Sequence, residues 1–162
     1  MTYPKWVVLQ ITQRCNLRCK MCYEWGENGA YLSQKTLDDL PLQTIEEVLG
    51  TLTPQGTYFE LFGGEPLLHP QFKEIMQLIE KYQCKIDIPT NGTLLTRYAK
   101  EIVQAQIRRL WVSIDGPEAI NDLQRGAGVY AKAIEGIRAL QAEKKRRNSA
   151  YPWIGRTNRS GR

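Results

Sequence analysis

The stretch Cys15-Asn16-Leu17-Arg18-Cys19-Lys20-Met21-Cys22 contains three of the four cysteines of the chain within eight residues. The spacing C-x3-C-x2-C allows three thiolates to bind one metal centre from a single loop. A closed structural zinc site has four protein ligands, and no fourth ligand lies nearby in this sequence. A [4Fe–4S] cluster held by three cysteines instead leaves one iron free to bind a substrate or cofactor. The stretch therefore indicates a metal centre that is one protein ligand short.

The overall composition is that of an ordinary soluble domain, since 42% of the 162 residues are hydrophobic and 24% are charged. We expect no signal peptide at the start of these residues, and none of their apolar stretches approaches the ~18 residues that a membrane span needs. We therefore expect a cytoplasmic protein with no membrane partner. In that compartment clustered cysteines are more often metal ligands than disulfides, whereas the isolated Cys84 is expected to be a small buried thiol.

The net charge of +5 is concentrated near the end of the sequence. Residues 143–162 hold seven of the 22 basic side chains and one of the 17 acidic ones, so the other residues carry a net charge of −1. We expect a core domain over residues 1–142 and a basic, disordered or truncated tail over 143–162, in which 151–155 could begin a fifth strand and 156–162 are disordered. Because no aromatic residues alternate with the basic ones and no recognised motif is present, we expect no specific nucleic-acid partner.

Four short β-branched runs alternate with four segments of helical periodicity. The runs predicted as strands are 6–11, 58–62, 85–88 and 110–114. The segments predicted as helices are 37–52, 72–79, 95–106 and 130–140. Strands that alternate with helices pair in parallel through right-handed crossovers, so the sequence predicts an α/β fold. Four such units cannot close an eight-stranded barrel, which takes ~250 residues.

A distinctive motif follows each predicted strand. The cysteine stretch comes after the first strand, and the others are Gly63-Gly64-Glu65-Pro66, Thr90-Asn91-Gly92 and Asp115-Gly116-Pro117. In parallel α/β folds, the loops at the carboxyl ends of the strands meet at one edge and form the ligand site. The sequence therefore predicts a single site built from all four loops.

These motifs, over about residues 6–142, resemble those of the radical SAM superfamily. The cysteine loop followed by Gly63-Gly64-Glu65-Pro66 at the next strand end is the most specific match, and 90–92, 113–116 and 125–126 add to it. The resemblance implies a partial parallel (βα) barrel with about four βα units of a (βα)6 core. The fifth-strand adenine motif and the sixth strand of that core are not found in these residues, so we expect weakened cofactor binding.

The resemblance also implies two cofactors. A [4Fe–4S] cluster would be bound by Cys15, Cys19 and Cys22, and S-adenosylmethionine would bind its open iron. Reductive cleavage of S-adenosylmethionine would yield a 5′-deoxyadenosyl radical, so the protein is expected to be an enzyme that starts radical chemistry. The residues implied to contact S-adenosylmethionine are Met21, Gly63, Gly64, Glu65, Thr90, Asn91, Ser113, Asp115 and Arg125.

Elementary chemistry suits several of these roles. Gly63 and Gly64 lack a Cβ and permit close approach of a ligand, and Glu65 offers a carboxylate for an ammonium group. The polar residues after the third and fourth strands offer neutral hydrogen bonds, and Asn16 can stabilise its own turn.

Other residues have an alternative structural reading. Asp115 could cap the following turn, and Arg125 could be a structural arginine. His69, the only histidine, is expected to cap or pack at a helix start rather than to act as a base.

The patterns at 113–116 and 125–126 are most similar to superfamily members that modify peptides or mature other enzymes, and also to the molybdenum-cofactor cyclase branch. We therefore expect a peptide or protein substrate, and an electron donor such as flavodoxin or ferredoxin. The alternative is a non-catalytic iron–sulfur or zinc-binding remnant of such an enzyme. The two hypotheses differ in whether S-adenosylmethionine contacts the cluster.

Overall fold

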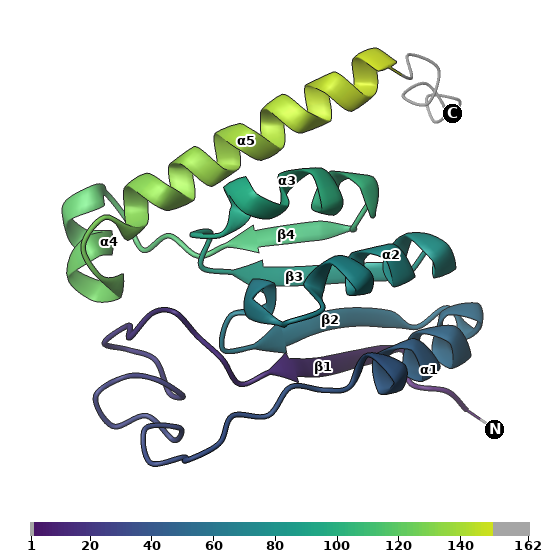
Figure 1. Ribbon diagram of the computed structural model, residues 1–162, viewed down its shortest axis with the longest axis horizontal. Helices are drawn as coiled ribbons and strands as arrows, with labels where there is room; N and C mark the ends of the chain where they lie inside the picture. Colours follow the sequence, from purple (N-terminus) through teal and green to yellow (C-terminus); the bar gives the residue numbers. More distant parts are fainter. Residues whose placement is uncertain (1, 151–162) are drawn as a thin grey trace, which may run out of the picture.

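A four-stranded parallel sheet forms the centre of the computed structural model, which describes residues 2–150 (Figure 1). The strands lie side by side in their sequence order, β1-β2-β3-β4. Their bounds are Trp6–Thr12 for β1, Tyr58–Gly63 for β2, Lys85–Thr90 for β3 and Arg109–Val112 for β4. All neighbouring strands pair in parallel, and the predicted parallel α/β fold is therefore confirmed.

Three helices cover one face of this sheet (Figure 1). They are α1 (Leu42–Leu52), α2 (Phe72–Tyr82) and α3 (Leu95–Gln104), each of which connects two consecutive strands. Single 3-10 turns, η1 (Thr53–Gln55) and η2 (Pro66–Leu68), follow α1 and β2. After β4 the chain forms the short helix α4 (Glu118–Arg125) and the long helix α5 (Val129–Ala150), which packs along α3. The loops after the four strands consequently meet at one end of the sheet.

The core lies between the sheet and these helices, because alternate side chains of a strand point to opposite faces. On the helical face, Ile11, Leu61 and Ile88 are fully buried. Large apolar side chains that are exposed on the other face are Trp6, Val8, Tyr58, Phe62 and Trp111. Parallel sheets are normally covered on both faces. The second face is open among residues 2–150, as expected for part of a barrel.

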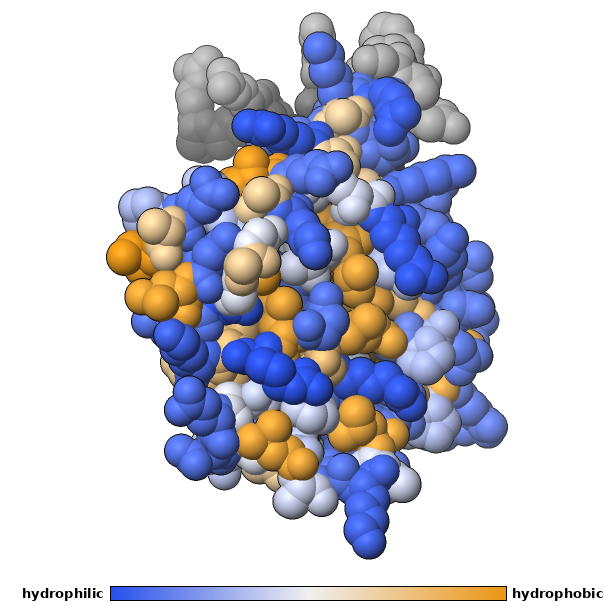
Figure 2. Space-filling model, turned by 60° about the vertical axis from the view of Figure 1, so that its left-hand side comes forward, coloured by the Kyte–Doolittle hydropathy of each residue, from blue (hydrophilic) through white to orange (hydrophobic). Residues whose placement is uncertain are grey.

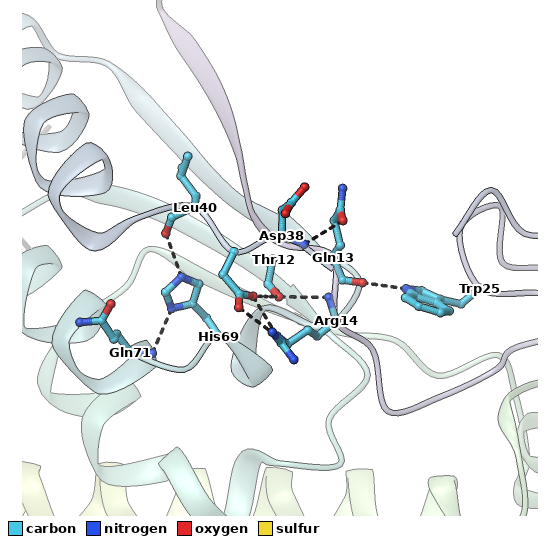
Figure 3. A network of polar contacts seen from close by, with 9 residues as sticks. Thr12, Gln13, Arg14, Trp25, Asp38, Leu40, His69 and Gln71 are labelled. Carbon is cyan, nitrogen blue, oxygen red and sulfur yellow. Dashed lines mark hydrogen bonds and ion pairs between the residues drawn. The ribbon is translucent and has the colours of Figure 1, made fainter. Parts of the chain in front are cut away.

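The free edge of β1 is partly covered at its carboxyl end (Figure 3). Thr12 forms an antiparallel bridge with Asp39, and its hydroxyl donates to the Asp39 carboxylate at 2.6 Å. The Leu40 N–H donates to the Ile11 carbonyl at 2.8 Å. A short segment of this kind blocks pairing of the edge with another chain. The edge of β4 has no comparable cover within the described residues.

Some element bounds differ from those predicted. Helix α1 begins at Leu42 rather than at residue 37, because the residue before Pro41 is disfavoured in helical conformation. Strand β3 continues to Thr90, and β4 ends at Val112 rather than at residue 114. Helix α4 was not predicted at all.

Helix α5 runs without interruption through the predicted domain boundary between residues 142 and 143. Arg146 pairs with Glu143 one turn earlier, and Arg147 donates to the Val103 carbonyl of α3. Residues 143–150 are therefore helical rather than disordered. The predicted strand at 151–155 and the predicted disorder at 156–162 lie outside the described residues. Between residues 2 and 150, every helix is too short or too polar to cross a membrane.

Candidate functional site

A cavity of about 410 Å³ lies at the carboxyl ends of the strands, where the four loops meet. Figure 2, which brings this end of the molecule forward, shows hydrophobic side chains gathered among hydrophilic ones. The predicted site residues that line the cavity are Cys15, Cys19, Met21, Cys22, Gly63, Gly64, Glu65, Thr90, Asn91, Ser113 and Arg125. Asp115 is set back from the cavity and is paired with Arg125. The structure thus brings residues from all four loops to one place.

Six further residues, which were not among those implied to bind the two cofactors, also line this cavity. They are Leu17, Tyr23, Glu24, Phe62, Pro66 and Pro89. Phe62 is an apolar residue on the open face at the end of β2. Its place in the site could be predicted only once it was known which face of that strand is buried. Burial raises the pKa of Glu24, and Gln10 donates to its carboxylate at 3.3 Å. These residues add apolar walls and a second carboxylate to the site.

All three cysteines of the loop are free thiols. Backbone N–H groups donate to two of them, Leu17 to Cys15 Sγ at 3.5 Å and Trp25 to Cys22 Sγ at 3.3 Å. Burial raises the pKa of the Cys15 thiol to about 11, and the negative charge of Glu65 adds to this effect. Within residues 2–150, no three His, Cys, Asp or Glu side chains are close enough to share a single metal ion. The three thiols of the loop line one cavity and are therefore available to a shared centre.

Gly63 and Gly64 lie where the end of β2 crosses the start of the cysteine loop, and a side chain would not fit at either position. A Cβ on Gly63 would lie 2.2 Å from the Thr12 carbonyl oxygen, and one on Gly64 would lie 2.5 Å from that of Arg14. The Gly64 N–H donates to the Thr12 carbonyl at 3.1 Å, and the Glu65 N–H donates to the Arg14 carbonyl at 2.7 Å. The close approach at these glycines is thus made by the start of the cysteine loop, which is fixed against the end of β2.

Glu65 is the buried carboxylate of the cavity, with 1% of its surface exposed. Its Oε1 accepts from the Thr90 hydroxyl at 2.7 Å and from the Leu67 N–H at 3.2 Å, and its Oε2 accepts from the Asn91 N–H at 2.7 Å. Burial raises the pKa of this carboxyl against the opposing effect of these three hydrogen bonds. A carboxylate has about four acceptor positions, so one position on Oε2 stays open. All three donors are neutral, which leaves the negative charge available to a cationic ligand.

The polar side chains after β3 are tied to other loops. The Thr90 hydroxyl also accepts from the Gly92 N–H at 3.1 Å. Asn91 Nδ2 donates to Asn16 Oδ1 at 2.9 Å, and Asn16 Nδ2 donates to Thr93 Oγ1 at 2.9 Å. Asn16 was expected to stabilise its own turn, and this expectation is wrong, because its partners lie 75 and 77 residues further along the chain. The cysteine loop therefore contacts the end of β3.

Arg125 and Asp115 form a bidentate ion pair beside the cysteine loop, with N···O distances of 2.7 and 2.9 Å. Burial raises the pKa of the Cys19 thiol, and the nearby charge of Arg125 opposes this shift. The Lys20 N–H donates to the Gln124 carbonyl at 2.9 Å, so the end of α4 supports the loop. Asp115 therefore acts on the site through Arg125.

His69 and Cys84 both lie outside the cavity lining. His69 is buried, its Nε2 donates to the Leu40 carbonyl at 3.0 Å, and its Nδ1 accepts from the Gln71 N–H at 3.1 Å (Figure 3). These contacts confirm the predicted structural role at a helix start. Cys84 is buried and contacts the Thr53 hydroxyl at 3.2 Å, as expected for a structural thiol.

Comparison with known proteins identifies a family that this chain matches and several relatives. A family model described as the radical SAM superfamily matches residues 9–157. The GTP 3′,8-cyclase of Rhizobium etli (strain CIAT 652) is 34% identical over 143 residues, which cover 82% of this chain and 39% of that protein. The tungsten-containing aldehyde ferredoxin oxidoreductase cofactor-modifying protein of Pyrococcus furiosus is 33% identical over 140 residues, covering 82% and 38%. This chain thus spans about two fifths of the length of these relatives.

Solved structures agree with the fold. Native anSMEcpe with bound AdoMet matches with a TM-score of 0.69 at 23% identity, over 86% of this chain and 41% of that one. SuiB of Streptococcus suis bound to S-adenosylmethionine matches with a TM-score of 0.72 at 16% identity, over 87% and 32%. The four βα units are therefore part of the barrel that these structures share.

Proposed function

This chain belongs to the radical SAM superfamily, and we propose that Cys15, Cys19 and Cys22 bind a [4Fe–4S] cluster beside a site for S-adenosylmethionine. We further propose that the protein is an enzyme that cleaves S-adenosylmethionine reductively to start radical chemistry on a separate substrate. One observation carries the proposal: all three thiols line the same cavity as the buried carboxylate of Glu65.

The donor set fits an iron–sulfur cluster better than it fits zinc. Zinc in a structural site is held by four ligands around one ion, whereas the cysteine loop supplies three thiols. Three thiols along one cavity wall, two of them accepting backbone N–H groups, match the hydrogen-bonded thiolate ligands of iron–sulfur clusters. Glu65 lines the same cavity as the three thiols, so its carboxylate and the cluster would both be available to one cofactor.

The cavity also suits S-adenosylmethionine, whose amino-acid part carries an ammonium and a carboxylate. Glu65 would offer its free acceptor position to the ammonium, and Arg125, which is paired with Asp115 through Nε and Nη2, would offer its remaining N–H groups to the carboxylate. Met21 and Phe62 provide apolar walls for the adenine ring. When bound, the cluster supplies the electron for cleavage of the cofactor, a reaction that protein side chains do not perform. The residues of the chain itself bind and orient the cofactor and keep water away from it.

We propose a peptide or protein substrate and an electron donor such as flavodoxin or ferredoxin, in line with the patterns at 113–116 and 125–126. A nucleotide substrate is the second candidate, because relatives 34% identical to this chain are named GTP 3′,8-cyclase. The open face of the sheet, which borders the cavity at Phe62, is where either substrate would approach.

Anaerobic reconstitution with iron and sulfide tests this proposal against the zinc-binding and non-catalytic alternatives. After reduction with dithionite, we expect an electron paramagnetic resonance (EPR) signal of [4Fe–4S]⁺ that changes when S-adenosylmethionine is added. A cluster signal that ignores S-adenosylmethionine would favour the non-catalytic remnant. Zinc in place of iron would exclude the radical mechanism for this chain.

A further inference from the structure

Asn16, the residue after Cys15, joins the cysteine loop to the loop that follows β3. Its Oδ1 accepts from Asn91 Nδ2 and its Nδ2 donates to Thr93 Oγ1, both at 2.9 Å. Thr93 Oγ1 in turn donates to Asn91 Oδ1 at 2.6 Å. The side chains of Asn16, Asn91 and Thr93 thus form a closed ring of hydrogen bonds, which we call the amide ring. Because each residue in it donates once and accepts once, the ring fixes the orientation of both amides.

The amide ring is attached to the buried carboxylate of the cavity. The Asn91 N–H donates to Glu65 Oε2 at 2.7 Å. On the other side of the cysteine, the Glu65 N–H donates to the Arg14 carbonyl at 2.7 Å. Cys15 therefore lies between two residues that are each tied to Glu65, Arg14 directly and Asn16 through the amide ring.

We propose that Asn16 is a positioning residue, which through the amide ring holds the thiol of Cys15 at a fixed place relative to Glu65. The inference rests on the proposed function, in which Cys15 binds the cluster and Glu65 binds the ammonium group of S-adenosylmethionine. A cofactor that contacts both loops at once binds more tightly when their spacing is fixed beforehand. Neutral amides suit this place, since a carboxylate at residue 16 would lie close to thiolates and to Glu65.

The test measures the dissociation constant of S-adenosylmethionine for the reconstituted protein, from the change that the cofactor causes in the EPR spectrum. The variants are N16A, T93V and the double variant N16A/T93V. T93V removes only the hydroxyl of the ring and keeps the shape of the side chain, so it serves if N16A folds poorly. N28A is the matched control, because Asn28 is an exposed asparagine close to the cysteines and outside the amide ring.

We expect N16A to retain the iron content of N28A but to bind S-adenosylmethionine about tenfold more weakly, the effect of losing one or two hydrogen bonds. T93V should bind several-fold more weakly, and the double variant should bind no more weakly than N16A, because the ring is already open. The inference would be overturned if N16A and T93V bound S-adenosylmethionine as tightly as N28A does. It would also be overturned if the effects of the two substitutions multiplied in the double variant. Either result would leave the proposed function standing. A wild-type protein that does not respond to S-adenosylmethionine would overturn the proposed function and this inference with it.

Discussion

The two ends of the sheet hold their buried carboxylates in opposite ways. At the amino end, Asp87 accepts two hydrogen bonds from the guanidinium of Arg108, at 2.8 and 2.5 Å, in the wall of a cavity of about 360 Å³. At the carboxyl end, Glu65 accepts only from neutral donors, and burial raises its pKa. The charge of a carboxylate beside its own guanidinium is compensated within the protein, whereas that of a buried carboxylate with only neutral donors would be compensated by a cationic ligand. Glu65 would therefore gain a partner from a cationic ligand, whereas Asp87 already has one in Arg108.

Removal of a cysteine from the loop should have the largest effect on iron binding at the carboxyl end of the sheet. C19A should lose nearly all of the iron that the reconstituted wild type binds, because two thiolates do not hold the cluster. C84A is the matched control and should keep its iron, since Cys84 lies outside the cavity lining. Iron and sulfide content per chain measure the effect. Wild-type iron content in C19A would contradict the ligand assignment.

Substitution of His69 tests whether a buried polar side chain near the carboxyl end can stabilise the fold without contributing to ligand binding. H69A removes the bonds to the Leu40 carbonyl and the Gln71 N–H, so the free energy of unfolding should fall by about 1–3 kcal/mol. Iron content and affinity for S-adenosylmethionine should stay unchanged. Urea unfolding measures the first quantity, and an unaltered unfolding curve combined with lost cofactor binding would assign His69 to the site instead.

The uncompensated charge of Glu65 predicts a pH dependence of stability in the cofactor-free protein. Because burial raises its pKa above 4.5, its contribution to stability is fully present below that pH and is lost as the pH rises through the raised pKa. The free energy of unfolding of the wild type should therefore fall relative to that of E65Q as the pH rises above 4.5 and through the raised pKa. Urea unfolding of both proteins over this range measures the difference. A difference that grows with pH would show that the carboxylate is compensated after all.

Substitution of Arg108, at the amino end of the sheet, should have the smallest effect on stability. R108M leaves the buried Asp87 without its guanidinium, and the melting temperature should decrease only slightly, because the Arg108 side chain is 39% exposed and water can take its place. Binding of S-adenosylmethionine should not change. A loss of cofactor affinity in R108M would show that the two ends are coupled and that the contrast between them is incomplete.

The sheet and the cavity could be predicted from the sequence because they follow from strong local patterns. Apolar residues at alternate positions, such as Phe59 and Leu61, mark buried strands, and the motifs after those strands must meet at one edge. The end of α5 could not be predicted, because residues 143–147 are charged throughout and show no apolar stripe.

Helix α4 and the contacts of Asn16 were missed for other physical reasons. Helix α4 has only eight residues, and its two large apolar residues, Ile120 and Leu123, have helical spacing but stay exposed, so the sequence offers no long apolar stripe there. Its end is instead held by polar contacts, including those of Arg125 with Asp115. The partners of Asn16 lie in a loop far along the chain, and only the folded sheet brings them together.

The proposed role of Glu65 is tested most directly by EPR titrations that compare the binding of S-adenosylmethionine to the reconstituted wild type and to E65Q. E60Q is the control, since Glu60 lies on the same strand but lines the cavity at the amino end. We predict that E65Q binds about 10- to 100-fold more weakly, the effect of losing one charge-assisted hydrogen bond, while E60Q binds like the wild type. Equal affinities for E65Q and the wild type would contradict the claim that the carboxyl end keeps this charge for a cationic ligand.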